Sequence, residues 1–279
     1  MKLTTTVDIT PPARLFSLSD KIVLLGSCFA DNMAGKLSDA GFNICANPFG
    51  TLYNPASIRA AVERLDGTAD FGPADCVEMG AGAGRICSFE HHTSFARTTE
   101  EEFLENANAR LLQAREFWKE ADRVIITLGT SMVWFHDGKA VSNCLKRPAG
   151  EFTRRMLEIS EISSALESIA KAHPEKDFTL TVSPIRHLGD GARANTLSKA
   201  RLLIAAASCP GSFYFPAYEI MMDELRDYRF YADDLVHPTP AAIQYIWERF
   251  LATCVSPADF PAISRNEKDS RQKAHRQIL

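Results

Sequence analysis

Residues 21–30 read KIVLLGSCFA, and this stretch decides the fold that we expect for the chain. Its first five residues form a short apolar run that ends at Gly26, which is typical of a buried strand followed by a turn. The next helix is predicted to begin near residue 30. In an open α/β sheet, ligands bind at the carboxyl ends of the strands. Ser27 is therefore predicted at that edge, close to the unpaired N–H groups of the helix.

Four more apolar runs alternate with helical patterns along the chain. These runs are residues 42–45, Arg123–Leu128, Asp177–Val182 and residues 212–215. Helix starts are indicated by Asn54-Pro55, by Thr239-Pro240 and by a capping box at Thr98 or Thr99, and helical patterns cover residues 160–172 and 192–208. This alternation predicts an α/β fold with three layers, a flavodoxin-like doubly wound parallel sheet of about five strands.

The sequence is interpreted as one domain over residues 1–279. Two stretches interrupt the alternation and are predicted insertions, at about 67–98 and 132–150. The second contains Asp137-Gly138, a strong hairpin signal. The polar residues from about 257 to 279 are expected to form a peripheral helix or a frayed end.

Composition excludes several classes of protein. The 279 residues are 46% hydrophobic and 24% charged with a formal net charge of −4, so no basic excess points to nucleic acid. No apolar run approaches the roughly 20 residues that cross a bilayer. The seven cysteines form no CxxC pair, and no basic segment followed by an apolar stretch opens the chain. We therefore expect free thiols and a cytoplasmic location, while the oligomeric state is not indicated.

A second cluster of reactive residues precedes the last predicted helix, in DDLVHPT at residues 233–239. An aspartate three residues before a histidine can fold back and accept the histidine Nδ1–H, which leaves Nε2 free to take a proton from a hydroxyl. Asp234 has this offset to His237, whereas Asp233 does not. The sequence therefore predicts that Asp234 orients His237.

Cys28 is a rival nucleophile to Ser27. A cysteine needs a partner base and an environment that favours its thiolate, and a helix N-terminus helps to provide one. Successive residues at a turn point in different directions, so only one of the two can face the histidine. We predict Ser27 in that role and Cys28 as a small packed hydrophobe.

Together, a serine after the first strand and Asp-x-x-His before the last helix resemble the layout of the SGNH (GDSL-like) hydrolase superfamily. Residues 26–30 read GSCFA, the name motif of the GSCFA-domain family within it. Residues 47–55, 183–187, 195–200 and 234–238 also look like blocks of that family, and the resemblance covers roughly residues 1–255. It implies the SGNH fold, with Ser27 as nucleophile, His237 as general base and Asp234 as its orienting carboxylate.

The same resemblance implies an esterase or deacylase that forms an acyl-serine intermediate. The substrate is expected to be a small or carbohydrate-linked ester, and neither a metal nor another cofactor is expected. By similarity the oxyanion hole uses the N–H groups of Ser27 and Gly50 and an asparagine amide. Ser131 stands where that asparagine is expected, and Asn143 is our preferred substitute. Since one missing donor typically costs about 10²–10³ in rate, an inactive or weakly active binding or scaffold domain is the alternative.

Other polar residues have weaker functional interpretations. Arg186 and His187 follow the fourth strand at the same sheet edge, where Arg186 either binds a substrate carboxylate, phosphate or sugar hydroxyl, or makes a structural ion pair. Lys199 is expected on the solvated face of the next helix. His91 and His92 make a poor metal site, because adjacent residues rarely share one ion and no third ligand is evident.

Overall fold

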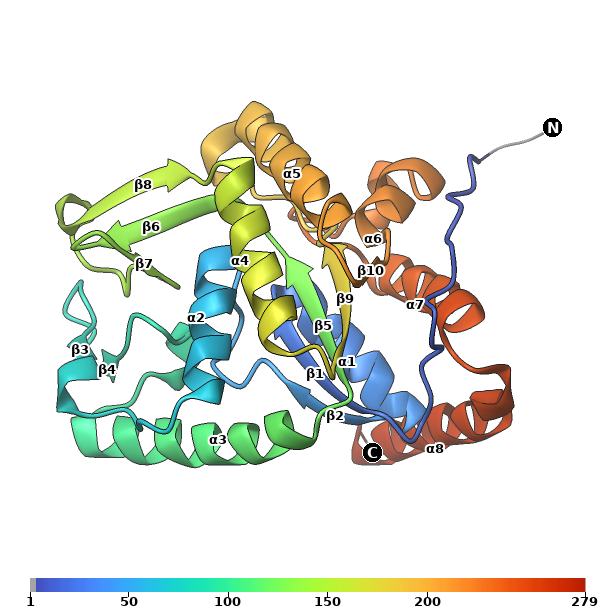
Figure 1. Ribbon diagram of the computed structural model, residues 1–279, viewed down its shortest axis with the longest axis horizontal. Helices are drawn as coiled ribbons and strands as arrows, with labels where there is room; N and C mark the ends of the chain where they lie inside the picture. Colours follow the sequence, from blue (N-terminus) through green and yellow to red (C-terminus); the bar gives the residue numbers. More distant parts are fainter. Residues whose placement is uncertain (1–3, 279) are drawn as a thin grey trace.

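The computed structural model describes residues 4–278, and Figure 1 shows a central sheet with helices on both sides. Five parallel strands form this sheet: β1 (Lys21–Gly26), β2 (Asn43–Ala46), β5 (Arg123–Leu128), β9 (Asp177–Val182) and β10 (Ser212–Tyr214). Their order is β10-β9-β5-β1-β2, so β1 lies between β2 and β5. This is the flavodoxin-like order, and the predicted fold class is confirmed.

Alternate residues of β1 point into two separate cores. Val23 and Leu25 pack with one set of helices, whereas Ile22 and Leu24 pack with the other. The first core is covered by α2 (Pro55–Asp66), α3 (Glu100–Glu120), α4 (Ile159–Ala172) and α5 (Gly191–Ala207). The second is covered by α1 (Cys28–Ala40), α7 (Pro240–Cys254) and α8 (Phe260–Ile278). Burial on both faces explains why the strands are apolar throughout.

The predicted helix starts rest on local hydrogen bonds. Asn54 caps α2 by accepting from the Ser57 N–H at 2.9 Å, with Pro55 as the first helical residue. Thr239 caps α7 in the same way ahead of a proline. Of the two capping registers proposed for α3, the structure has Thr99, whose hydroxyl accepts from the Glu102 N–H.

Two groups of short strands lie outside the central sheet. β3 (Val77–Glu78) pairs with β4 (Ile86–Cys87), and β6 (Met132–His136) lies between β7 (Lys139–Val141) and β8 (Phe152–Met156). Asp137 and Gly138 connect β6 to β7 with positive φ values of 48° and 75°, as the hairpin signal predicts. In Figure 1, β3 and β4 lie near α2 and α3, whereas the β6–β8 group lies farther from α3, on the side of α2 and α4.

The remaining helical segments are short. A turn of α-helix at α6 (Ala217–Glu219) continues into a π-helical turn at Ile220–Glu224. Single 3-10 turns occupy Pro73–Asp75, Thr93–Phe95, Ala149–Glu151, Leu188–Asp190, Tyr228–Phe230 and Pro257–Asp259.

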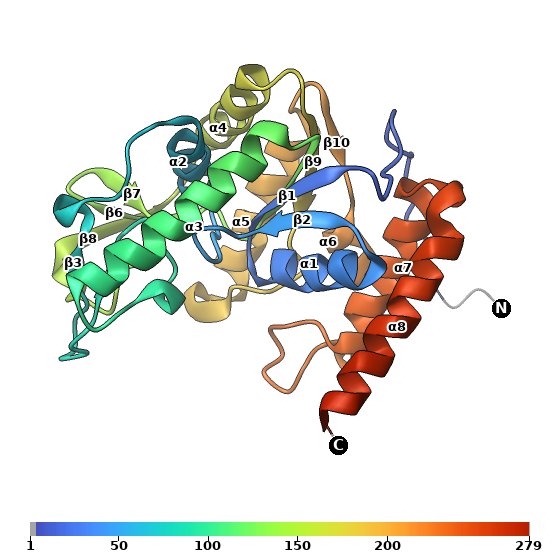
Figure 2. The same ribbon diagram turned by 90° about the horizontal axis from the view of Figure 1, so that it is seen from below.

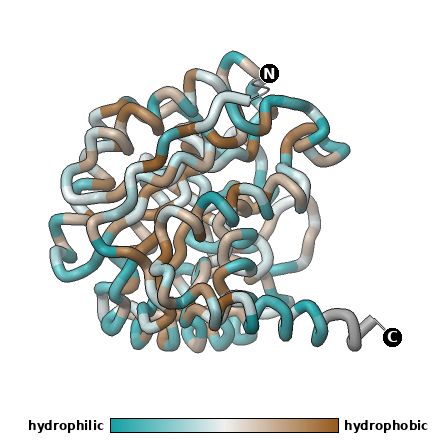
Figure 3. Tube along the Cα trace, turned by 90° about the vertical axis from the view of Figure 1, so that its right-hand side faces the viewer, coloured by the Kyte–Doolittle hydropathy of each residue, from teal (hydrophilic) through white to brown (hydrophobic). Residues whose placement is uncertain are grey.

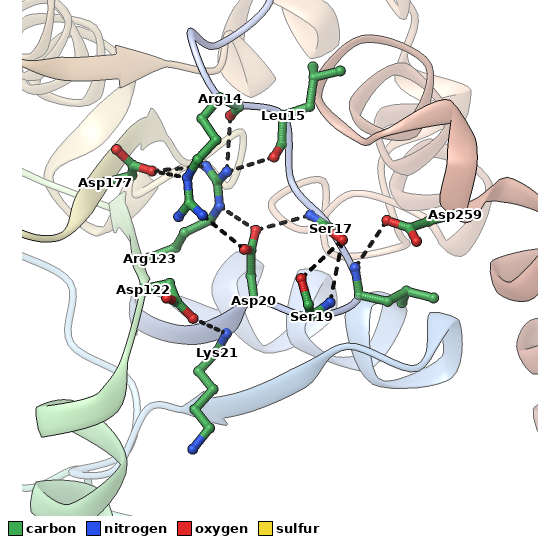
Figure 4. Close-up of polar contacts among 11 residues, drawn as sticks. Arg14, Leu15, Ser17, Ser19, Asp20, Lys21, Asp122, Arg123, Asp177 and Asp259 are labelled. Atoms are coloured by element: carbon green, nitrogen blue, oxygen red, sulfur yellow. Dashed lines mark hydrogen bonds and ion pairs between the residues drawn. The ribbon is translucent and has the colours of Figure 1, made fainter.

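A buried ion pair holds the N-terminal segment to the sheet (Figure 4). The Arg123 side chain is 2% exposed and donates from Nε to Asp20 at 2.5 Å. It also donates to the carbonyl oxygens of Arg14 and Leu15, and its guanidinium lies 4.2 Å from the ring centroid of Phe16. The chain before β1 is thereby tied to the amino end of β5.

The polar C-terminal residues form α8, which lies against α1 and α7 in Figure 2. Asn266 donates to the Ala40 carbonyl at the end of α1, and Glu267 accepts from the Trp247 indole. Hydrophilic residues follow one another along α8, as the teal tube in Figure 3 shows. Among residues 4–278, no helix combines the length and the apolar character needed to cross a membrane.

Candidate active site

The GSCFA letters have separate structural roles at the turn between β1 and α1. Gly26 has φ of +147°, and a Cβ there would lie 2.3 Å from the Thr127 carbonyl oxygen. The strands β1 and β5 can therefore approach this closely only because residue 26 has no side chain. Phe29 and Ala30 are fully buried, and Phe29 belongs to the second core. Ser27 and Cys28, the two nucleophilic side chains, lie between these structural positions.

Ser27 and Cys28 face different surroundings. Ser27 is the N-cap of α1, is 0% exposed, and its Oγ accepts from the Phe29 N–H at 3.3 Å. Cys28 is the first residue of α1 and is partly exposed on the wall of a cavity. Ser27 is not among the residues that line this cavity. The structure therefore gives the predicted serine nucleophile no direct access, and that role stays a prediction.

The cavity lies at the carboxyl edge of the sheet and has a volume of about 400 Å³. Its wall comes from the start of α1, the loop after β2, the β6–β7 hairpin, the loop after β9 and the segment before α7. The residues that bear on its chemistry are Cys28, Tyr53, Asn143, Arg154, Arg186, His187 and His237. Trp134 also lines it.

His237 and Asp234 form the predicted pair. Nδ1 of His237 lies 2.6 Å from Asp234 Oδ2, and both side chains are about half exposed. Asp234 Oδ1 also accepts the backbone N–H groups of Val236 and His237, at 2.8 and 2.9 Å. These backbone and side-chain bonds from His237, with that from Val236, lower the pKa of Asp234 to about 2. The aspartate is therefore ionised at neutral pH and holds the Nδ1 side of the ring, which leaves Nε2 free in a residue that lines the cavity.

Tyr53 is a site residue that the sequence did not single out. Its hydroxyl lies 3.4 Å from Cys28 Sγ and accepts from Thr51 at 3.2 Å. Burial is the larger cause and the hydrogen bond with Cys28 the smaller one of a rise in the pKa of Tyr53 to about 12. The phenol therefore keeps its proton at neutral pH. Tyr53 belongs to the motif at residues 47–55, but nothing in the sequence indicated that its ring would turn toward α1.

The predicted oxyanion donors all make hydrogen bonds within the protein. The Ser27 N–H donates to the Thr127 carbonyl at 3.3 Å, and the Gly50 N–H donates to the Asn47 carbonyl at 2.8 Å. Asn143 lines the cavity, but its amide donates to the His91 carbonyl and accepts from the Leu145 N–H. Ser131, the other candidate, is fully buried and bonded to Ser198.

Arg186 and His187 both line the cavity, as their place after β9 predicts. Arg186 donates from Nη1 to the Leu235 carbonyl at 3.0 Å, and its backbone N–H donates to the Val236 carbonyl, so it also holds the segment before His237. His187 Nε2 is buried with no hydrogen-bond partner among the described residues. Burial, with the nearby charges of Lys199 and His237, lowers the pKa of His187 to about 4, so its ring is neutral at pH 7.

The expectation that Lys199 is solvated is wrong. Lys199 is 1% exposed, and its Nζ donates to the carbonyl oxygens of Gly129 at 2.6 Å and Ser183 at 2.7 Å. These carbonyls directly follow β5 and β9. The lysine therefore joins the two strand ends beneath the cavity, a role that depends on the fold and not on the local sequence pattern.

His91 and His92 have different neighbours. His91 is 1% exposed, lies among the rings of Phe49, Phe71, Phe95 and Phe103, and shares a hydrogen bond with Ser88 at 2.7 Å. His92 bonds to Ser94. Within the described residues, no group of three histidine, cysteine, aspartate or glutamate side chains is arranged to hold a metal ion.

A family model matches most of the chain. The model of the GSCFA family matches residues 21–250. No curated protein matches the chain. Among solved structures, the chain is similar to the psychrotrophic esterase EstA from Pseudoalteromonas sp., with 12% identity, a TM-score of 0.39, and coverage of 84% of this chain and 96% of that one. It is also similar to a carbohydrate esterase family 2 enzyme from Corynascus thermopiles, with 13% identity, a TM-score of 0.39, and coverage of 91% and 69%.

Proposed function

The chain belongs to the GSCFA family, and from the geometry of its site we propose that it hydrolyses small acyl esters through a covalent acyl-enzyme. The observation that carries this proposal is the His237–Asp234 pair, whose histidine lines the same cavity as Cys28, the first residue of α1. A nucleophile, a histidine base and a carboxylate that orients the histidine are the parts that acyl transfer requires.

In this proposal His237 Nε2 takes the proton of the nucleophile as it attacks the ester carbonyl carbon. The same proton then passes to the departing alcohol oxygen. A water molecule attacks the acyl-enzyme in the second half of the reaction, again with His237 as base. Asp234 stabilises the imidazolium that forms in each half. Ser27 and Cys28 are the two nucleophilic side chains at this end of α1, and the prediction from sequence is Ser27.

We propose two donors for the developing oxyanion. Cys28 is the first residue of α1, so its backbone N–H has no acceptor within the helix. His187 supplies the second donor once its ring turns toward the cavity that the residue lines, because the ring is neutral at pH 7 and its buried Nε2 has no partner among the described residues. This pair would take over from Gly50 and Asn143, each of which already donates to a backbone carbonyl oxygen.

The cavity favours a compact, polar substrate. Its volume of about 400 Å³ suits a short acyl group with a small alcohol or a single sugar, and Arg154, Arg186 and the two histidines offer donors to its oxygens. All seven cysteines are free thiols, which suits the reducing cytoplasm that we propose as its location.

The test is a panel of short-chain p-nitrophenyl esters and acetylated sugars assayed with the wild type and with His237→Asn. We expect turnover by the wild type and a loss of at least about 10³-fold in the variant, since the base is removed. His173→Asn changes a histidine remote from the cavity and is the matched control. Equal turnover by wild type and His237→Asn would refute His237 as the base, and no turnover by either would favour a binding domain on the same fold.

A further inference from the structure

We infer that Cys28, and not Ser27, carries the acyl group, so that the enzyme is a cysteine hydrolase. This inference rests on the proposed function. It follows from the direction in which each of the two adjacent side chains points at the start of α1.

Burial excludes Ser27 from the cavity in the structure as it stands. The side chain is 0% exposed, and its Oγ is turned back over the first turn of α1, toward the Phe29 N–H. Its Cβ lies against Gly129, where an added Cβ would be 3.4 Å away. An attack by Ser27 would require the hydroxyl to leave its capping position and to become exposed to the cavity.

Cys28 already occupies the position that a nucleophile needs. It lines the cavity together with His237, and it is partly exposed. As the first residue of α1 it lies at the positive end of the helix dipole, which favours an anion there. The helix end therefore favours the negative charge of the attacking sulfur, and His237 lines the same cavity and can accept the thiol proton.

Tyr53 adds a hydrogen-bond donor for the sulfur. Thr51 donates to the Tyr53 hydroxyl at 3.2 Å, so the phenol hydrogen is free to point at Cys28 Sγ, 3.4 Å away. With a pKa of about 12 the phenol remains protonated at neutral pH. Donation from a neutral phenol stabilises a thiolate more than a thiol, because the acceptor is charged.

The chemical steps balance without an additional reactant. His237 Nε2 takes the Cys28 S–H proton, and the sulfur lone pair forms the S–C bond at the ester carbonyl. The C–O bond to the alcohol then breaks, and the alcohol leaves with the proton from His237. Water next loses a proton to His237, forms a C–O bond at the thioester carbon, and the S–C bond breaks to release the carboxylic acid and Cys28.

Cys144 is the competing thiol, because it also lines the cavity and is partly exposed. It follows the β6–β7 hairpin, with neither a helix N-terminus nor the Tyr53 hydroxyl beside it, and burial raises the pKa of Cys144 above its usual value. Its thiol therefore keeps its proton at neutral pH, and we expect it to remain unacylated.

The experiment uses the full chain and p-nitrophenyl acetate. Wild type, Ser27→Ala, Cys28→Ala and Cys28→Ser are each mixed with the ester, quenched in acid and analysed by intact mass and peptide mapping for an attached acetyl group. Inactivation by iodoacetamide is followed in parallel. Cys76→Ser is the matched control, since Cys76 is a partly exposed thiol outside the cavity.

We expect the acetyl group on Cys28, a loss of turnover of at least about 10³-fold in Cys28→Ala, and full resistance of Cys28→Ser to iodoacetamide inactivation. Ser27→Ala should retain acylation, with turnover within about 10-fold of wild type because a lost cap moves the first turn of α1 only slightly. Acetylation of Ser27 or Cys144, or normal acylation of Cys28→Ala, would overturn the inference while leaving an acyl-transfer function intact. If wild type neither turns over nor becomes acylated, the proposed function itself fails.

Discussion

Replacing His91 with phenylalanine should remove much of the acid sensitivity of the fold. His91 is 1% exposed among four phenylalanine rings, and burial, together with the charge of Arg64, lowers its pKa to about 3 from an unfolded value of 6.5. Below pH 6.5 the unfolded chain therefore binds a proton at this residue that the folded chain does not bind. Stability must fall as pH falls, starting near pH 6.5 and continuing to about pH 3.

The size of this effect follows from the two pKa values. Between pH 7.5 and pH 5, protonation of the unfolded state at His91 lowers the free energy of unfolding by about 2 kcal/mol. Asn143, which lines the cavity, donates a hydrogen bond to the His91 carbonyl, so protonation of His91 would also disturb the support of the cavity wall. His187, with a pKa of about 4, adds a similar term in wild type and variant alike. The difference between the two proteins therefore isolates His91.

The measurement is urea unfolding of wild type and His91→Phe at several pH values from 7.5 to 5. Ser88 loses its partner in the variant, which shifts stability equally at every pH, so the pH dependence of the difference is the quantity to compare. We expect the variant to gain about 2 kcal/mol relative to wild type over this range. If both proteins lose the same stability within about 0.5 kcal/mol, the argument that His91 is buried in its neutral form is refuted.

Three further predictions concern the general base, the sheet and the turn before α1. Asp234→Asn keeps an acceptor for the two backbone N–H groups but places an amide donor at His237 Nδ1. Ester turnover should therefore fall by about 10²–10³-fold, less than the loss of roughly 10⁴-fold in a buried triad. The control variant Asp233→Asn should not alter the rate. Asp20→Ala leaves the buried Arg123 guanidinium without its nearest carboxylate and should cost about 3 kcal/mol in urea unfolding. Gly26→Ala should lower Tm far more than Gly82→Ala, because both glycines have positive φ but only Gly26 has a carbonyl oxygen within 2.3 Å of the new Cβ.

The central sheet could be predicted from sequence because its signals are local. Each of the five strands is a short apolar run between turn residues, and burial on both faces removes the need for any polar alternation. β8 was missed for the opposite reason. Its residues Phe152–Met156 include Thr153, Arg154 and Arg155, which are exposed, and the segment is a strand only because β6 pairs with it. A strand that depends on its partner leaves little trace in its own composition.

The polar network beneath the site was equally hard to predict. Lys199 looked like a surface lysine because its helix has only a weak separation of polar and apolar faces, with Asn195 and Ser198 also buried. Its acceptors, the carbonyls of Gly129 and Ser183, come from two loops far apart in sequence. Backbone carbonyls carry no sequence signal, so burial of an amine among them can be recognised only in three dimensions.

The choice between Ser27 and Cys28 depended on where α1 begins. A start near residue 30 left both side chains in the preceding loop, where either could face the histidine. In the structure α1 begins at Cys28, which makes Ser27 the capping residue. A capping hydroxyl turns back to accept an N–H of the first turn, whereas the next side chain is free to project from the helix end. An error of two residues in a helix boundary is ordinary for prediction from sequence. Here such an error is enough to assign the nucleophile to Ser27, the capping residue, in place of Cys28.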